Sequence, residues 1–338
     1  ILAMVADMYL WLKDYANADK YAQMVIKNKT EYFENNYPQS YMTNGYPLIP
    51  DYGGGLLSIG DAYRYTFAEG GGPESIFELD FTESTTDNSK SNNMMAEFFY
   101  KSVNQANPEP GLFAPAEGLW EEFVSPTLFF NKQDTRIKES MFVDGDQNNP
   151  ELVYISKYVN ETPHVTSSTG WRQTKNDANW IFYRVSDMML IRAEALVCMM
   201  TDEENDRNDS LGQVAFELVK AIEDRSCPPN GESGISYSNY STKDLMLDLV
   251  YDARRREFLF EGKRWFDLVR RSRLEGNTTY LVDAVSDKFT ENAATATGKL
   301  GNMMAIYWPY NYDELQVNPN LTQNPAYPEA GDSYESTN

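Results

Sequence analysis

The chain has 338 residues, which suits one large domain or two small ones, and its 41% hydrophobic content is enough for a sizeable core. Its 29 Lys and Arg against 51 Asp and Glu give a net charge of −22, so its surface repels phosphate backbones and anionic lipid. Nucleic acid is therefore not an expected partner. The sequence also has no run of about 18 apolar residues that could form a membrane-spanning helix.

Two helices are predicted within residues 1–28. Apolar residues recur there at helical spacing, at Leu2, Ala6, Tyr9 and Leu10 in the first helix and at Ala18, Ala22, Val25 and Ile26 in the second. Small alanines let two helices approach closely, as in tetratricopeptide-like pairs. The first residues already have a helical pattern, without Met or a basic leader. We therefore expect the true N-terminus, with any targeting segment, to lie outside this numbering.

Residues 32–180 lose the helical period and are predicted to form a long, partly β insert. Gly, Pro, Asn and Ser interrupt this region, yet tyrosines keep recurring in it. Residues 75–81 alternate between apolar and acidic side chains, which predicts a half-buried strand, and a second strand is predicted for residues 152–158. Long loops inside a compact domain usually carry function, so we expect the binding surface in this insert.

Residues 181–275 are predicted to complete the helical body. Ser186 is a candidate cap for a helix that ends near Met200, and Asp209 or Ser210 for its partner. Residues 252–271 combine many bases with large apolar side chains, and nearby acids favour a buried ionic network at a corner between two helices. Gly262 marks the break between these helices. Residues 276–338 are predicted to be a C-terminal tail that packs on the body.

The predicted fold is thus a single, mainly α domain of tetratricopeptide-like helix pairs with long irregular, partly β inserted loops. The helical body comprises residues 1–31 and 181–275, and the loop-rich insert comprises residues 32–180.

Five landmarks occur in a fixed order along the chain. They are residues 12–18 (LKDYANA), 134–136 (DTR), 183–195 (YRVSDMMLIRAEA), 254–268 (RRREFLFEGKRWFDL) and 318–325 (NPNLTQNP). Together they resemble the SusD/RagB family of outer-membrane nutrient-binding lipoproteins of Bacteroidetes. The third and fourth landmarks are specific, whereas the first alone is generic. Ala253 departs from the acidic residue that commonly precedes the arginine run in the family.

The resemblance implies a non-enzymatic protein that binds an oligosaccharide or polysaccharide at the cell surface. It implies delivery of this ligand to a SusC-like TonB-dependent transporter in the outer membrane. Attachment to the membrane would come only through a lipid anchor, and the Cys that carries it in the family has no counterpart in this chain. No cofactor is expected.

Aromatic rings in the loops are the candidate ligand contacts. Sugars stack their apolar C–H faces on aromatic rings, while amides and carboxylates bond to their hydroxyls. The candidates are Trp171, Tyr63, Tyr65 and Trp120, with Asp61 and Asn176 as polar neighbours. Each of these rings could instead anchor a loop to the body. Trp180 and Trp265 lie inside the landmarks and are assigned to packing.

Three other functions stay open. The ligand could be a peptide, as in the RagB branch of the family. The chain could be a glycoside hydrolase, because a catalytic pair of carboxylates is defined in space and not by spacing in the sequence. It could also be a helical scaffold without a small ligand, which predicts that the loop aromatics are buried.

No metal site is expected. Asp144, Asp146 and Asn148 alternate like the first ligands of a calcium loop. However, Asn149 stands where such a loop needs Gly, and Ile155 stands where it needs Glu.

Overall fold

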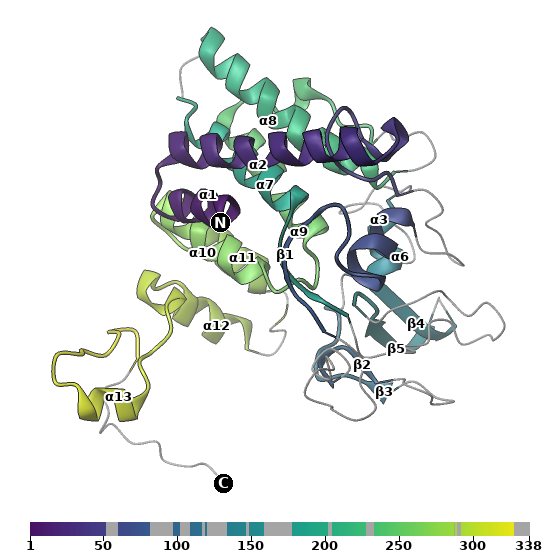
Figure 1. Ribbon diagram of the computed structural model, residues 1–338. Coiled ribbons are helices and arrows are strands. Elements are labelled where there is room, and N and C mark those ends of the chain that lie inside the picture. The colour runs from purple at the N-terminus through teal and green to yellow at the C-terminus, as the bar shows by residue number, and fades with distance from the viewer. Residues whose placement is uncertain are drawn as a thin grey trace. The chain divides into compact units, whose positions relative to one another are not determined.

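A computed structural model gives the fold of the chain (Figure 1). It describes residues 1–51, 60–81, 97–101, 109–116, 119, 134–146, 149–158, 178–201, 205–227, 233–286, 288 and 292–327. The chain forms two compact units, Ile1–Gly262 and Lys263–Asn338. Their boundary falls at Gly262, where the sequence predicts a break between two helices.

The first unit is built on five helices: α1 (Leu2–Trp11), α2 (Tyr15–Asn36), α7 (Val185–Cys198), α8 (Asp206–Arg225) and α9 (Lys243–Glu257). Helix α7 packs against α2, α8 and α9, which explains why it is buried on nearly all sides and is apolar around most of its circumference. The alanines of the predicted stripes, Ala6, Ala18 and Ala22, are fully buried. The prediction of a mainly helical fold is confirmed.

Two predicted helix starts are wrong by a few residues. Helix α7 begins after Arg184, whose backbone N–H donates to the Asp187 carboxylate (3.0 Å), so Ser186 lies inside the first turn and is not the cap. Helix α8 is capped by Asn205, whose side-chain oxygen accepts from the backbone N–H of Asn208 (2.9 Å). The helix therefore begins a turn earlier than a cap at Asp209 would allow.

The described strands form three antiparallel pairs. Strand β1 (Ser75–Leu79) pairs with β6 (Trp180–Arg184), β2 (Tyr100–Lys101) pairs with β3 (Glu109–Pro110), and β4 (Met141–Asp146) pairs with β5 (Asn149–Ile155). The predicted strands correspond to β1 and to part of β5, whereas β4 was not predicted. Asp144 and Asp146 lie in β4, so the alternation that resembles the start of a calcium loop belongs to a β-hairpin. Among the described residues, no group of His, Cys, Asp or Glu could hold a metal ion.

The apolar face of strand β1, which the alternation of apolar and acidic residues predicts to be buried, is partly exposed. Phe77 and Leu79 are 47% and 46% exposed. The ring of Phe77 instead stacks on Phe182 of β6, with 5.2 Å between the ring centroids. The two-stranded pair therefore presents an aromatic face of its own.

Short helical segments complete the first unit: η1 (Gln39–Tyr41), α3 (Asp61–Tyr63), η2 (Arg64–Ala68), α6 (Arg136–Ser140) and η4 (Tyr237–Asn239). The second unit contains α10 (Arg264–Glu275), α11 (Thr279–Ser286), α12 (Ala293–Leu300), η5 (Met303–Ile306) and α13 (Tyr312–Val317). The segment predicted as a tail thus carries short helices. None of the helices described here is long and apolar enough to cross a membrane.

Candidate functional site

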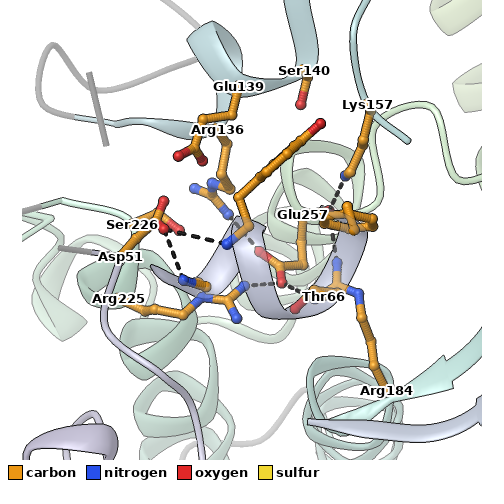
Figure 2. A pocket seen from close by; sticks show the side chains of 13 residues that line it. Asp51, Thr66, Arg136, Glu139, Ser140, Lys157, Arg184, Arg225, Ser226 and Glu257 are labelled. Carbon is orange, nitrogen blue, oxygen red and sulfur yellow. Dashed lines mark hydrogen bonds and ion pairs between the residues drawn. The ribbon is translucent and has the colours of Figure 1, made fainter. Parts of the chain in front are cut away.

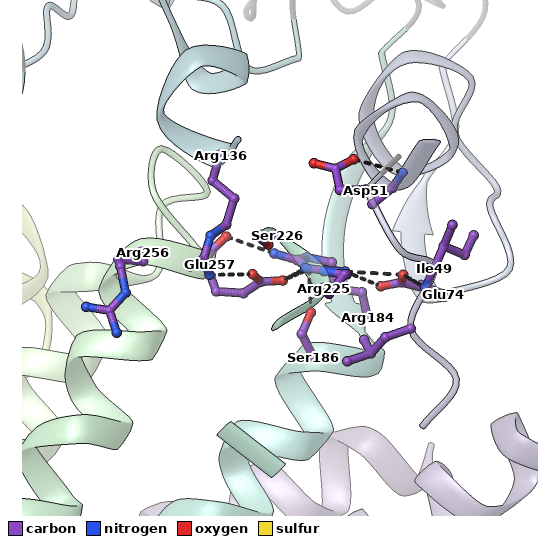
Figure 3. Close-up of polar contacts among 12 residues, drawn as sticks. Ile49, Asp51, Glu74, Arg136, Arg184, Ser186, Arg225, Ser226, Arg256 and Glu257 are labelled. Carbon is purple, nitrogen blue, oxygen red and sulfur yellow. Dashed lines mark hydrogen bonds and ion pairs between the residues drawn. The ribbon is translucent and has the colours of Figure 1, made fainter. Parts of the chain in front are cut away.

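Three buried arginines converge on one carboxylate at the end of α9 (Figure 3). Arg136, Arg184 and Arg225 all bond to the side chain of Glu257, and the Arg136 bond joins Nη1 to Oε2 at 3.1 Å. We call these four residues the arginine cluster. Burial alone would raise the pKa of Glu257, but the charges of Arg225, Arg184 and Arg136 hold it well below its usual value. Glu257 is therefore an anion in the folded protein.

Further acids surround the arginine cluster and compensate its excess positive charge. Glu74 pairs with Arg225 (2.9 Å), Glu223 pairs with Arg136 (2.7 Å), and Glu261 pairs with Arg184 (2.8 Å). Glu261 also bonds to the buried amine of Lys157 (2.7 Å). Burial lowers the pKa of Lys157 to about 8, although the charge of Glu261 opposes this shift. Glu257 and Glu261 both come from the predicted corner of residues 252–271.

The prediction of a buried ionic network at this corner is confirmed, but its most buried partners differ from those expected. The spacing of residues 252–271 predicts pairs within one helix, and Asp267 and Arg270 do pair in this way (2.9 Å). In contrast, Glu257 binds arginines that lie 32 to 121 residues away in the sequence. The corner therefore joins distant segments of the first unit.

The cavity beside the arginine cluster is too small for a sugar (Figure 2). Its volume of about 30 Å³ corresponds to roughly one water molecule. Side chains of the cluster line it, together with Lys157, Asp51 and Glu139. Burial and the charge of Asp51 raise the pKa of Glu139 well above its usual value. Because these groups are buried and bonded to one another, we assign the cluster a structural role: it holds distant segments of the first unit together.

A second arrangement, of aromatic rings, lies at the end of α2. Tyr32 lies in the last turns of α2, Tyr37 directly follows this helix, Tyr41 belongs to η1 and Tyr65 belongs to η2. Successive ring centroids are 5.9, 5.7 and 6.2 Å apart. Tyr32 is 45% exposed and the other three are half-buried. We call these four residues the tyrosine row. They bring rings from two separate segments of the insert to one partly exposed site.

Hydroxyl and charged groups accompany the tyrosine row. The hydroxyl oxygens of Tyr41 and Tyr65 are 3.5 Å apart. This hydrogen bond raises the pKa of Tyr41, and partial burial adds to the shift, so the hydroxyl stays neutral. The guanidinium of Arg64 lies 4.4 Å from the ring centroid of Tyr65 and pairs with Asp61 (2.8 Å). Stacking surfaces, hydroxyls and a carboxylate thus meet within a few ångströms, which is the chemistry that sugar recognition requires.

The structure brings together two of the site residues predicted from the sequence, Tyr65 and Asp61, through Arg64. Tyr63 is only 4% exposed, and its hydroxyl donates to the carbonyl oxygen of Ser156 (2.9 Å), so its ring belongs to the core and not to an open binding surface. The other predicted site residues lie outside the described part of the chain: Trp120, Trp171 and Asn176.

Three members of the tyrosine row are not among the site residues predicted from the sequence. Tyr37 and Tyr41 belong to the run of recurring tyrosines, and Tyr32 precedes it within α2. Tyr32, Tyr37 and Tyr41 are five and four residues apart across the end of a helix. This spacing was the feature of the sequence from which a row of rings could have been predicted. Trp180 was assigned to packing, and it stacks on the buried ring of Tyr158 with 5.3 Å between the centroids.

Comparison with known proteins identifies the family. A sequence model of the SusD family matches residues 145–327, which is more than half of the chain. This chain belongs to the SusD family. It is 27% identical over 356 residues to the SusD-like protein P38 of Formosa agariphila, and this match covers 97% of the chain and 59% of that protein. The family predicted from the five landmarks is confirmed.

Solved structures show the same fold. A SusD superfamily protein from Bacteroides vulgatus matches with a TM-score of 0.59 and 18% identity, over 96% of this chain and 62% of that one. Surface glycan-binding protein A from Bacteroides uniformis matches with a TM-score of 0.56 and 17% identity, over 96% and 60%. A laminarin-binding SusD-like protein matches with a TM-score of 0.53 and 19% identity, over 96% and 62%. The chain spans about three fifths of the length of these relatives.

The SusD family model covers most of the arginine cluster but none of the tyrosine row. The matched span contains Arg184, Arg225 and Glu257 of the arginine cluster. The tyrosine row, from Tyr32 to Tyr65, lies before the span begins. The cluster thus belongs to the part of the chain that carries the family pattern, and the row lies in a part that this pattern does not cover.

Proposed function

We propose that this SusD-family chain binds a glycan at the cell surface without changing it chemically, and that the tyrosine row is part of its binding site. The row supports this proposal because it gathers four partly exposed aromatic rings, with their hydroxyls and the Asp61 carboxylate beside them. Aromatic stacking together with a few convergent polar groups is the usual basis of sugar recognition. The fold shared with a laminarin-binding SusD-like protein and with a surface glycan-binding protein is consistent with it.

Delivery of the glycan to a SusC-like TonB-dependent transporter in the outer membrane is a further part of this proposal. It rests on membership of the SusD family. Purification of the tagged, full-length protein from outer membranes tests the partnership. Recovery of a TonB-dependent transporter in stoichiometric amount is the expected result, and recovery of the protein alone would contradict it.

A glycoside hydrolase is less well supported by the described carboxylates. Hydrolysis needs two carboxyl groups that flank the glycosidic bond. Asp51, Glu139 and Glu257 gather around a cavity of about 30 Å³, which cannot admit a sugar ring. Incubating the protein with the glycan that it binds best should release no sugar, as expected of a binding protein of the SusD family. Released product would show that the protein is a hydrolase.

The first test of the proposal is calorimetric titration against neutral polysaccharides, laminarin and soluble starch among them, and against a peptide mixture. We expect binding to at least one polysaccharide. Substituting Tyr65→Ala removes one ring and the hydroxyl partner of Tyr41, so it should weaken this binding by about 1–3 kcal/mol. Saturable binding of peptides alone would indicate the peptide-binding branch instead.

Tyr9→Ala is the matched control for this substitution. Tyr9 is half-buried and stacks on Tyr21, with 5.5 Å between the centroids, but it is not part of the tyrosine row. The Tyr9→Ala substitution should leave the affinity for the polysaccharide unchanged. Equal affinities of the wild-type and Tyr65→Ala proteins would remove the row from the binding site, and thermal unfolding of each variant would verify that it is folded.

A further inference from the structure

The charges beside the tyrosine row bear on the class of glycan that it accepts, and this inference rests on the proposed function. Arg64 lies beside the row, 4.4 Å from the ring centroid of Tyr65, but both ends of its guanidinium are paired with acids. Nη2 lies 2.8 Å from Asp61 Oδ1, and Nη1 lies 3.0 Å from Glu69 Oε1. The side chains of Asp61 and Glu69 are 36% and 49% exposed, so both face solvent at the site. These three groups together carry one net negative charge.

Lys29, a second cation near the row, is also engaged by the protein. Its amine lies 5.5 Å from the centroid of the Tyr32 ring. It donates to the backbone carbonyl oxygens of Pro73 (2.9 Å) and Ser75. Burial lowers the pKa of this amine, which the charge of Glu74 partly opposes. Two of the three N–H donors of this amine are thus already bonded to the backbone.

We infer that the tyrosine row is a site for uncharged glycans and that it discriminates against sugars bearing carboxylate or sulfate groups. An anionic group beside Tyr65 would have to displace Asp61 or Glu69 from Arg64, or lie next to both acids. Either arrangement places like charges together, which is an effective way to reject a wrong ligand. The hydroxyls of a neutral sugar can instead donate to these carboxylates and exchange hydrogen bonds with the tyrosine hydroxyls. The net charge of −22 adds long-range repulsion of polyanions.

The experiment compares neutral polysaccharides with charged derivatives of the same backbone. Laminarin is paired with laminarin sulfate and soluble starch with carboxymethyl starch, and all four are titrated at 0.15 M NaCl. The wild-type protein should bind the neutral member of at least one pair at least about tenfold more tightly than its derivative. Equal or tighter binding of the charged member would overturn the inference. Binding to no member of any pair would overturn the proposed function, and the inference with it.

A double substitution, Asp61→Asn with Glu69→Gln, tests whether the discrimination arises at the row. Removing the two acids frees Arg64, so the protein should bind the charged derivative more tightly. The ratio of the affinity for the neutral glycan to that for its charged derivative should fall by at least threefold. The control Asp313→Asn with Glu314→Gln makes the same change in net charge on the exposed helix α13 of the second unit. It should leave the ratio unchanged. An equal fall in both variants would assign the discrimination to the charge of the whole protein and overturn the role of the row.

Salt dependence gives a second measurement that needs no variant. Raising the NaCl concentration screens repulsion between exposed charges. The affinity of the wild-type protein for the charged derivative should therefore increase with salt, while that for the neutral glycan should stay constant. A decrease for the charged derivative would mean that attraction governs its binding, which contradicts the inference.

Discussion

At the scale of single residues, Glu257 is the side chain that neutralises charge on three buried arginines. Its two oxygens bind Arg136, Arg184 and Arg225, and the side chain of Glu257 is 1% exposed. A buried charge is tolerated when it is paired and hydrogen-bonded, and removing one partner leaves the others without compensation. Loss of the Glu257 charge would weaken three ionic bonds at once.

We predict that Glu257→Gln lowers the free energy of unfolding by about 3–5 kcal/mol, the usual effect of breaking a buried ion pair. Urea denaturation followed by circular dichroism measures this difference. Glu31→Gln is the control, because Glu31 pairs with Lys27 at 3.9 Å on the exposed surface and such pairs contribute little. Similar, small losses in the two variants would show that the arginine cluster does not stabilise the first unit.

At the scale of elements, two acids fix the start of α3, which leads into the segment that carries Arg64 and Tyr65. Asp51 Oδ1 accepts from the backbone N–H of Ala62 (3.1 Å), and Glu139 Oε1 accepts from that of Gly60 (2.6 Å). Gly60 lies so close to Asp51 that a Cβ atom there would stand 1.9 Å from Oδ1. The position of Tyr65 in the tyrosine row therefore depends on a close approach that only glycine permits.

We predict that Gly60→Ala lowers the free energy of unfolding by about 1–3 kcal/mol, as overpacking does elsewhere, and weakens glycan binding as well. The added methyl group must displace the Asp51 carboxylate and with it the start of α3. Gly298→Ala in α12 is the control, because no atom lies within 4 Å of the added Cβ and alanine favours a helix. Unchanged stability and affinity in Gly60→Ala would mean that the α3 segment adjusts without loss.

The sequence predicts the main helices and the family, because helical spacing and the five landmarks are local properties. It does not predict which side chains meet. Arg136 and Glu223 pair across 87 residues, and Tyr41 meets Tyr65 across 24, which no spacing rule detects. Tyr63 and Tyr65 are indistinguishable as loop tyrosines in the sequence. In the structure, the helical segment whose start bonds to Asp51 places Tyr63 in the core and leaves Tyr65 half-buried.

At the scale of the whole molecule, the chain is strongly negative, yet the arginine cluster pairs its charges in the buried interior. The net charge of −22 places an excess of acids on the surface, where they repel one another. The arginine cluster and the acids around it are buried, so dissolved salt screens their interactions much less than it screens exposed charges. Salt should therefore relieve surface repulsion without weakening the internal network.

We predict that the melting temperature rises by a few degrees when NaCl increases from 0.01 to 0.15 M, which shortens the Debye length from about 30 to about 8 Å. Differential scanning calorimetry at constant pH measures the shift, and choline chloride in place of NaCl should give the same result if screening, and not binding of sodium, is the cause. A variant with four exposed acids changed to amides, at Glu31, Glu34, Asp313 and Glu314, should show a smaller rise because less repulsion remains to be screened. A melting temperature that falls with salt would mean instead that attractive ion pairs on the surface outweigh the repulsion between its acids.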